Sequence, residues 1–180
     1  MAKFRNYAIL ALLAGLVLAL DQVTKELVRT RLAFGEIWMP WSALSPYFHV
    51  VHWNNTGAAF GMFQGGNLIF TVLAVMVSAA IIYYYRNSDT HSWPVRIALG
   101  LQLGGALGNL IDRLFFGTVT DFLWFSFFPA VSNFADLAIS SGVGLLLLDI
   151  LLENRKSQAP GAPPTPVAPP TPVAPPPETS

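Results

Sequence analysis

Residues 68–85 read LIFTVLAVMVSAAIIYYY, which is a stretch of 18 residues without a charged side chain. A helix of this length is about 27 Å long, close to the roughly 30 Å thickness of the hydrocarbon core of a bilayer. The stretch therefore predicts a transmembrane helix, and it is the one span in the chain that meets the length requirement without help from polar residues at its ends.

Further apolar stretches lie on either side of this span. The first has a rival interpretation, because Lys3 and Arg5 before a short apolar run are also typical of a cleaved signal peptide. No small-residue cleavage site follows Leu20, however, and the helical period continues through Val28, so we favour a retained span. We expect an all-α integral membrane protein with four transmembrane helices, the additional three being built on residues 7–20, 97–111 and 134–152.

The composition supports a membrane protein and excludes several classes of function. Hydrophobic residues make up 53% of the 180 residues and charged residues only 11%, against about 25% in soluble proteins. The formal net charge is zero, which argues against a nucleic-acid-binding protein. Cysteine is absent, so disulfides, thiolate zinc sites and a cysteine nucleophile are excluded. The three histidines form no metal-binding HExxH pair, and we expect no metal or cofactor.

Cations flanking the spans predict the orientation. Two arginines, Arg29 and Arg31, lie in the first loop, whereas six cations lie at the other ends of the spans. Cytoplasmic loops are enriched in lysine and arginine, so both termini are expected in the cytoplasm. The six are Lys3, Arg5, Arg86, Arg96, Arg155 and Lys156.

The outer segment, about residues 30–66, is predicted to form a small extracytoplasmic β-rich cradle between the first two helices. Residues 47–53, YFHVVHW, are β-branched and aromatic, which favours a strand, and residues 54–57 favour a turn. At the other end of the chain, the hexapeptide PPTPVA occurs twice within residues 157–180. We expect that tail to be disordered and Pro-rich, leaving residues 1–156 as the folded membrane domain.

The third span carries both small and polar residues. Gly100, Gly104 and Gly108 form a doubled GxxxG pattern, which predicts close helix packing and says nothing of chemistry. Gln102, Asn109 and Arg113 share one face of the same helix, with Asp112 on its flank. Polar groups at membrane depth normally face the bundle interior. Two interpretations remain open here, a structural cluster with Arg113 paired to a carboxylate, or direct contact with a substrate.

Two other acidic positions have mainly structural interpretations. Asp21 and Lys25 are spaced i, i+4 at the outer end of the first span, in the order that suits a helical ion pair. Asp149 lies near the cytoplasmic end of the fourth span and is interpreted as an interfacial residue.

Asp121 and Asp136 are the candidates for chemistry. Each has an ordinary explanation, since Asp121 could cap a short helix and Asp136 lies near the N3 position of the fourth span. Ser126, Pro129 and Ser132 between them favour a loop, which would let both acids return to the outer edge of the membrane. Two carboxylates in an apolar site share a proton, and such a pair can hydrolyse an amide without cysteine, histidine or metal.

Taken in order, four blocks of sequence resemble bacterial lipoprotein signal peptidase, also called signal peptidase II. The resemblance covers about residues 5–152, and each block is weak alone whereas the ordered set is specific. The blocks are DQVTK at 21–25, NTGAAFG at 55–61, GNLIDR at 108–113 with GTVTDF at 117–122, and NFAD at 133–136.

This resemblance implies an intramembrane aspartic endopeptidase that removes the signal peptide of prolipoproteins, cutting on the N-terminal side of a diacylglyceryl-modified cysteine. It implies Asp121 and Asp136 as the catalytic pair, and a supporting or structural role for Asp21 and Lys25. It also implies a multi-pass protein of the bacterial inner membrane, in contact with membrane lipids and monomeric, whose active site lies near the outer leaflet. The residues that it implies for lining the site or holding the substrate are Asn55, Gly57, Asn109, Arg113 and Asn133.

Two other classes of function remain as alternatives. A small proton-coupled multipass carrier would use the intramembrane acids as a relay, although its usual internal repeat is not found between the two halves of the chain. A non-catalytic membrane scaffold would use the same acids only to pair with Arg113 and Lys25.

Overall fold

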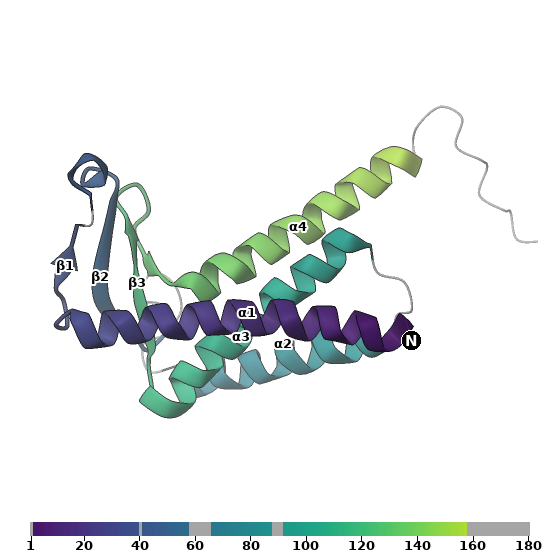
Figure 1. Cartoon of the computed structure of the whole chain (residues 1–180), viewed down its shortest axis with the longest axis horizontal. Coiled ribbons are helices and arrows are strands. Elements are labelled where there is room, and N and C mark those ends of the chain that lie inside the picture. The colour runs from purple at the N-terminus through teal and green to yellow at the C-terminus, as the bar shows by residue number, and fades with distance from the viewer. Residues whose placement is uncertain (1, 40, 58–65, 88–91, 158–180) are drawn as a thin grey trace, which may run out of the picture.

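The computed structural model describes residues 2–39, 41–57, 66–87 and 92–157. Four helices and a small sheet occupy these ranges, and the sheet lies at one end of the helices, opposite the N-terminus (Figure 1). The Pro-rich segment predicted to be disordered lies outside the described residues from position 158 on. The elements are α1 (Ala2–Arg31), β1 (Ile37–Trp38), the 3-10 turn η1 (Ser42–Leu44), β2 (Phe48–Asn55), α2 (Asn67–Asn87), α3 (Trp93–Phe116), β3 (Val119–Phe125), β4 (Val131–Ser132) and α4 (Phe134–Ser157).

Three of the helices are long and apolar enough to cross a membrane. They are Tyr7–Arg31 within α1, the whole of α2, and Phe134–Asn154 within α4. Helix α3 has 24 residues but falls outside this group, because glycines and polar side chains interrupt its apolar sequence. The prediction of a mainly helical membrane protein is confirmed.

Helix α3 is the centre of the helical bundle. It packs against α1, α2 and α4, whereas α2 and α4 have few residues in contact with each other. The predicted close packing at the glycines is confirmed. A Cβ on Gly104 would lie 2.6 Å from the Ala14 carbonyl oxygen, and one on Gly108 would collide with the Asp21 carboxylate. Small residues thus let α1 reach the polar face of α3.

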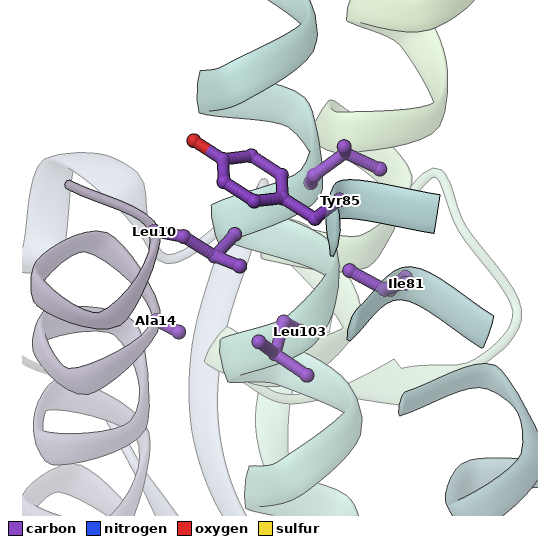
Figure 2. Packing of buried hydrophobic residues seen from close by; sticks show 6 residues of the cluster. Leu10, Ala14, Ile81, Tyr85 and Leu103 are labelled. Atoms are coloured by element: carbon purple, nitrogen blue, oxygen red, sulfur yellow. The ribbon is translucent and has the colours of Figure 1, made fainter. Parts of the chain in front are cut away.

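An apolar cluster joins α1, α2 and α3 away from the sheet. Figure 2 shows Leu10 and Ala14 of α1 facing Ile81 and Tyr85 of α2, with Leu103 of α3 between them. Lipid is as apolar as these side chains, so the cluster stabilises the bundle through close van der Waals packing.

The sheet is antiparallel with the strand order β1-β2-β3-β4. The predicted strand within residues 47–53 is confirmed, although β2 continues to Asn55 and the turn expected from residue 54 begins later. The expectation of a cradle built only between the first two helices was incomplete, because β3 and β4 come from the segment between α3 and α4. Residues 126–130 form the loop expected between Asp121 and Asp136, but residues 119–125, VTDFLWF, are β-branched and aromatic and pair with β2.

Local signals at the ends of α3 direct the chain into this sheet. Ser92 is the N-cap, and Pro94 occupies the first turn, where its missing N–H leaves no bond unmade. Gly117 ends the helix with a φ of 72°, a left-handed conformation that glycine adopts without strain. Strand β3 begins two residues later.

Candidate active site

Asp121 is held in the middle of the sheet by two amide side chains. It lies on β3 with 1% of its surface exposed. Asn55 Nδ2 donates to Asp121 Oδ2 at 2.9 Å, and Asn133 Nδ2 donates to Oδ1 at 2.6 Å. The antiparallel register brings Asn55 here, because its neighbour Asn54 is paired with Thr120. Asp121 therefore does not cap a helix.

Asp136 is held by the start of α4 and by α3. Asn133 precedes the helix, and the two residues bond reciprocally. Asp136 N donates to Asn133 Oδ1 at 3.0 Å, and Asn133 N donates to Asp136 Oδ2 at 3.3 Å. Asn109 Nδ2 donates to the other oxygen, Asp136 Oδ1, at 2.8 Å. The N3 position expected for Asp136 is confirmed, and its carboxylate also faces a cavity.

Both carboxylates line one cavity of about 490 Å³. Asn133 does not line the cavity, but it bonds to both acids. The structure thus brings all the residues expected at the site to one place. The wall consists of Asn55, Gly57, Phe70, Asn109, Arg113, Val119, Asp121, Phe125, Phe127, Phe128, Ala130, Val131, Ser132, Asp136, Leu137, Ile139 and Ser140.

The cavity is a difficult place for negative charge. Burial, together with the nearby carboxylate of Asp136, raises the pKa of Asp121 to about 7. The hydrogen bonds from Asn55 and Asn133 act in the opposite direction on this pKa, because they stabilise the ionised form. Near neutral pH the pair can therefore hold one proton between two carboxylates.

A buried ion cluster lies behind this cavity. Lys25 is fully buried, and its Nζ lies 2.8 Å from Asp21 Oδ2 and 3.2 Å from Asp112 Oδ2. The i, i+4 pair predicted between Asp21 and Lys25 is confirmed. The same ammonium donates to Asn109 Oδ1 at 2.9 Å, so it fixes the amide that bonds Asp136.

The cluster also anchors the two elements that carry the acids. Asp21 Oδ1 accepts from Ala135 N at 2.9 Å, next to Asp136. Asp112 Oδ2 accepts from Thr120 N at 3.0 Å, next to Asp121. Sequence reasoning missed this arrangement because each contact joins residues of different helices or strands.

Two further members of the cluster were not anticipated. Arg29 Nη1 lies 3.4 Å from Asp112 Oδ1 and donates to Thr120 Oγ1 at 3.1 Å. Gln22 Nε2 donates to the Gly108 carbonyl oxygen at 3.1 Å. A signal for Arg29 existed in the sequence, since it lies one turn after Lys25 on the same helix face.

Arg113 lines the cavity without an ion pair among the described residues. Its Nη1 donates to the Asn109 carbonyl oxygen at 3.3 Å, and its guanidinium lies 5.5 Å from the centre of the Phe70 ring. The alternative in which Arg113 pairs with a carboxylate is therefore not observed. Asp149, expected at an interface, accepts a hydrogen bond from Ser92 Oγ at 3.2 Å and is not part of the cavity wall.

The sequence profile of the family described as signal peptidase (SPase) II matches residues 13–152. The chain belongs to this family. Among its relatives, the lipoprotein signal peptidase of Desulfitobacterium hafniense is 46% identical over 144 residues, covering 80% of this chain and 93% of that protein. The lipoprotein signal peptidase of Symbiobacterium thermophilum is 42% identical over 151 residues, covering 82% and 97%.

Solved structures agree with this family assignment. One bacterial membrane enzyme superposes with a TM-score of 0.76 at 27% identity, covering 83% of this chain and 91% of the other. A second gives a TM-score of 0.70 at 28% identity, covering 79% and 92%. Together with the three apolar membrane-length helices, membership in the signal peptidase II family makes the chain a multi-pass enzyme of the bacterial inner membrane.

Proposed function

We propose that Asp121 and Asp136 are the catalytic pair with which this lipoprotein signal peptidase removes signal peptides from prolipoproteins. The observation that carries the assignment is the position of both carboxylates on one cavity, where each accepts a hydrogen bond from Asn133. Family membership and the names of the relatives support the activity itself.

The chemistry requires one proton on the pair. The ionised carboxylate takes a proton from a water molecule as the water oxygen bonds to the scissile carbonyl carbon. The protonated carboxyl gives its proton to the carbonyl oxygen, forming a neutral tetrahedral intermediate. Collapse of this intermediate breaks the C–N bond, and the leaving nitrogen takes the proton that came from water. The hydroxyl proton of the intermediate returns to the other carboxylate, so the pair ends with one proton, as it began.

The amide side chains position the pair. Asn55 and Asn133 orient Asp121, while Asn109 and Asn133 orient Asp136. Asn55 Oδ1 also accepts from Gly57 N at 2.9 Å, which fixes the chain at the rim of the cavity. Arg113, in the same wall, presents a cation and an apolar stem to the substrate.

The substrate proposed for this cavity is a prolipoprotein whose signal peptide is cut from the N-terminal side of a diacylglyceryl-modified cysteine. This assignment comes from the sequence resemblance, and the apolar wall supports it. Aromatic side chains from β3 and the segment after it, including Phe125, Phe127 and Phe128, are suited to contact acyl chains. Membrane lipids surround the helices, and the site is complete within one chain, which favours a monomer.

We further propose that α3 is the fourth span and that both termini are cytoplasmic. Asn109 and Asp112 of α3 have polar protein partners inside the bundle, which removes much of the cost of placing them in a membrane. The excess of cations at the N-terminus, the loop between α2 and α3, and the end of α4 supports this orientation, in which the sheet and the active site lie at the outer leaflet. We assign residues 1–156 to the peptidase domain.

One experiment separates a peptidase from the carrier and the scaffold. Purified protein is given a diacylglyceryl-modified prolipoprotein, and Asp121→Asn and Asp136→Asn are compared with wild type. Cleavage by wild type and loss of at least about 10³-fold in each variant is expected, because neither amide can exchange a proton as the reaction needs. Asp149→Asn is the matched control and should cleave normally. If folded Asp121→Asn or Asp136→Asn protein still cleaved the substrate at a substantial rate, the assignment of these two residues as the catalytic pair would be wrong.

A further inference from the structure

A second, narrower groove leads away from the cavity between α2, α3 and α4. Its volume is about 230 Å³, and four of its lining residues, Phe70, Asn109, Arg113 and Ile139, also line the cavity. The remaining wall is apolar except for one side chain, Gln102. The groove thus continues the candidate active site toward the middle of the bundle.

Gln102 is an exception among the polar groups near the site. Its Nε2 atom is buried and has no hydrogen-bond partner among the described residues. Gly142 of α4 makes room for the side chain, because a Cβ there would lie 2.7 Å from Gln102 Cγ. A buried donor without a partner costs free energy. Nε2 lies on the side of Gly142, 3.3 Å from the position of a Cβ there, and has no acceptor on that side in the described part of the chain.

A signal peptide bound for cleavage supplies acceptors of the right kind. A peptide bond inside a helix is shielded by the adjacent turns, so the apolar helix of the signal peptide must end before the scissile bond. Its last four carbonyl groups then have no partner within the helix. In an apolar groove these carbonyls need donors from the protein.

The position of Gln102 along α3 indicates which of these carbonyls lies level with its side chain. Gln102 lies seven residues before Asn109 on α3, or about 10 Å along the helix axis. Asn109 bonds Asp136 and marks the level of the scissile bond. At about 3.4 Å per residue, an extended peptide covers this distance in about three residues. The direction also agrees, since the start of α3 and the N-terminal part of a signal peptide both lie toward the cytoplasm in the proposed orientation.

We propose that the groove binds the signal peptide on the N-terminal side of the cleavage site, and that the Gln102 amide donates a hydrogen bond to a backbone carbonyl about three residues before the scissile bond. Rotation of the terminal amide, which is torsionally soft, turns Nε2 toward the peptide. The limited contact between α2 and α4 leaves this side of the groove free to receive the peptide from the lipid. The contact depends on Asp121 and Asp136 marking the scissile bond, as proposed above.

The test combines enzyme variants with altered substrate backbones. Diacylglyceryl-modified prolipoprotein peptides are made in which an ester replaces one backbone amide, so that the carbonyl two, three or four residues before the cut becomes a weaker acceptor. For wild type, one of these esters should lower kcat/KM about fivefold, the size expected for one net hydrogen bond. Gln102→Met should lower kcat/KM about fivefold on the all-amide peptide and lose the sensitivity to that ester.

Controls distinguish a failure of the Gln102 contact from a failure of the catalytic pair Asp121 and Asp136. Leu101→Met changes the neighbouring residue, which lines a different groove, and should keep both the activity and the ester sensitivity. Gln102→Leu replaces Gln102→Met if the latter does not fold. The contact is overturned if wild type cleaves all three ester peptides with the same kcat/KM as the all-amide peptide. It is also overturned if a Gln102 variant keeps the wild-type kcat/KM or the wild-type sensitivity to the ester. Cleavage of the same peptides by Asp121→Asn would overturn the catalytic pair instead. The Gln102 contact could still be judged in that case, because it is measured as the ratio of kcat/KM between the ester and amide substrates.

Discussion

Asn133 Nδ2 lies 2.6 Å from Asp121 Oδ1, and this hydrogen bond joins the residue just before α4 to the middle of β3. The same asparagine side chain accepts from Asp136 N through Oδ1 at 3.0 Å. One amide therefore sets the position of both candidate catalytic acids. It also caps the helix that carries one of them.

Two substitutions at this position should separate the cap from the contact with Asp121. Asn133→Ser keeps a side-chain oxygen for the helix N-terminus but has no amide to reach Asp121, so we expect near-normal stability and activity reduced about 10²-fold. Asn133→Ala removes both, with a further loss of about 1 kcal/mol of stability. Thermal unfolding and prolipoprotein cleavage measure the two effects. Equal activity of Asn133→Ser and wild type would show that the bond to Asp121 does not matter.

The rate of cleavage should fall as the pH rises above about 7. Burial and the Asp136 carboxylate raise the pKa of Asp121 to about 7. Above that pH the pair loses the proton that the reaction needs on one carboxyl, and the rate should drop about tenfold per pH unit. A pH profile of kcat/KM on a prolipoprotein without titrating groups near the cut measures this. A flat profile from about pH 6 to about pH 9 would contradict the shared proton.

Replacement of Lys25 by Met should strongly destabilise the protein. Lys25 is the fully buried cation between Asp21 and Asp112, and its loss leaves two buried carboxylates without their ammonium partner. Breaking a buried pair in this way costs about 3–5 kcal/mol. Thermal unfolding in detergent measures the loss. The triple variant Asp21→Asn, Lys25→Met, Asp112→Asn should recover part of it, and no recovery would point to packing instead of charge.

Gly108→Ala should destabilise the contact between α1 and α3. The added Cβ would collide with the Asp21 carboxylate, which belongs to the ion cluster and supports Ala135 N. We expect a loss of about 1–3 kcal/mol from overpacking, together with lower activity because the start of α4 shifts. Gly15→Ala is the matched control, since a Cβ added there would have no atom within 4 Å. Similar unfolding temperatures for the two variants would rule out the steric account.

Helical periodicity and spacing predicted several local features around the site, whereas the site residues themselves were implied by the resemblance to signal peptidase II. The Asp21–Lys25 pair, the close packing at the glycines and the N3 position of Asp136 all depend on residues within one helix or on one helix surface, so the chain order is enough to infer them. Strand β2 was also predicted, because its run of aromatic and β-branched residues has few other stable conformations.

The segment after α3 was predicted only in part. Residues 126–130 lie outside any helix or strand, as expected from Ser126 and Pro129, but the strands on either side of them were not predicted, because strand formation depends strongly on the partner strand. Residues 119–125 become a strand because β2 offers backbone hydrogen bonds in register with them. That pairing places Asp121 beside Asn55.

The sequence by itself determined the class of the protein, because 18 consecutive uncharged residues and a scarcity of charge leave a bilayer as the suitable environment. It also narrowed the chemistry to a few carboxylates. Only the tertiary structure decided how those carboxylates are supported, since Lys25 reaches Asp136 through Asn109, and Asn133 reaches Asp121, across long separations in the chain. Such contacts depend on how closely helices and strands pack in three dimensions, which local propensity does not encode.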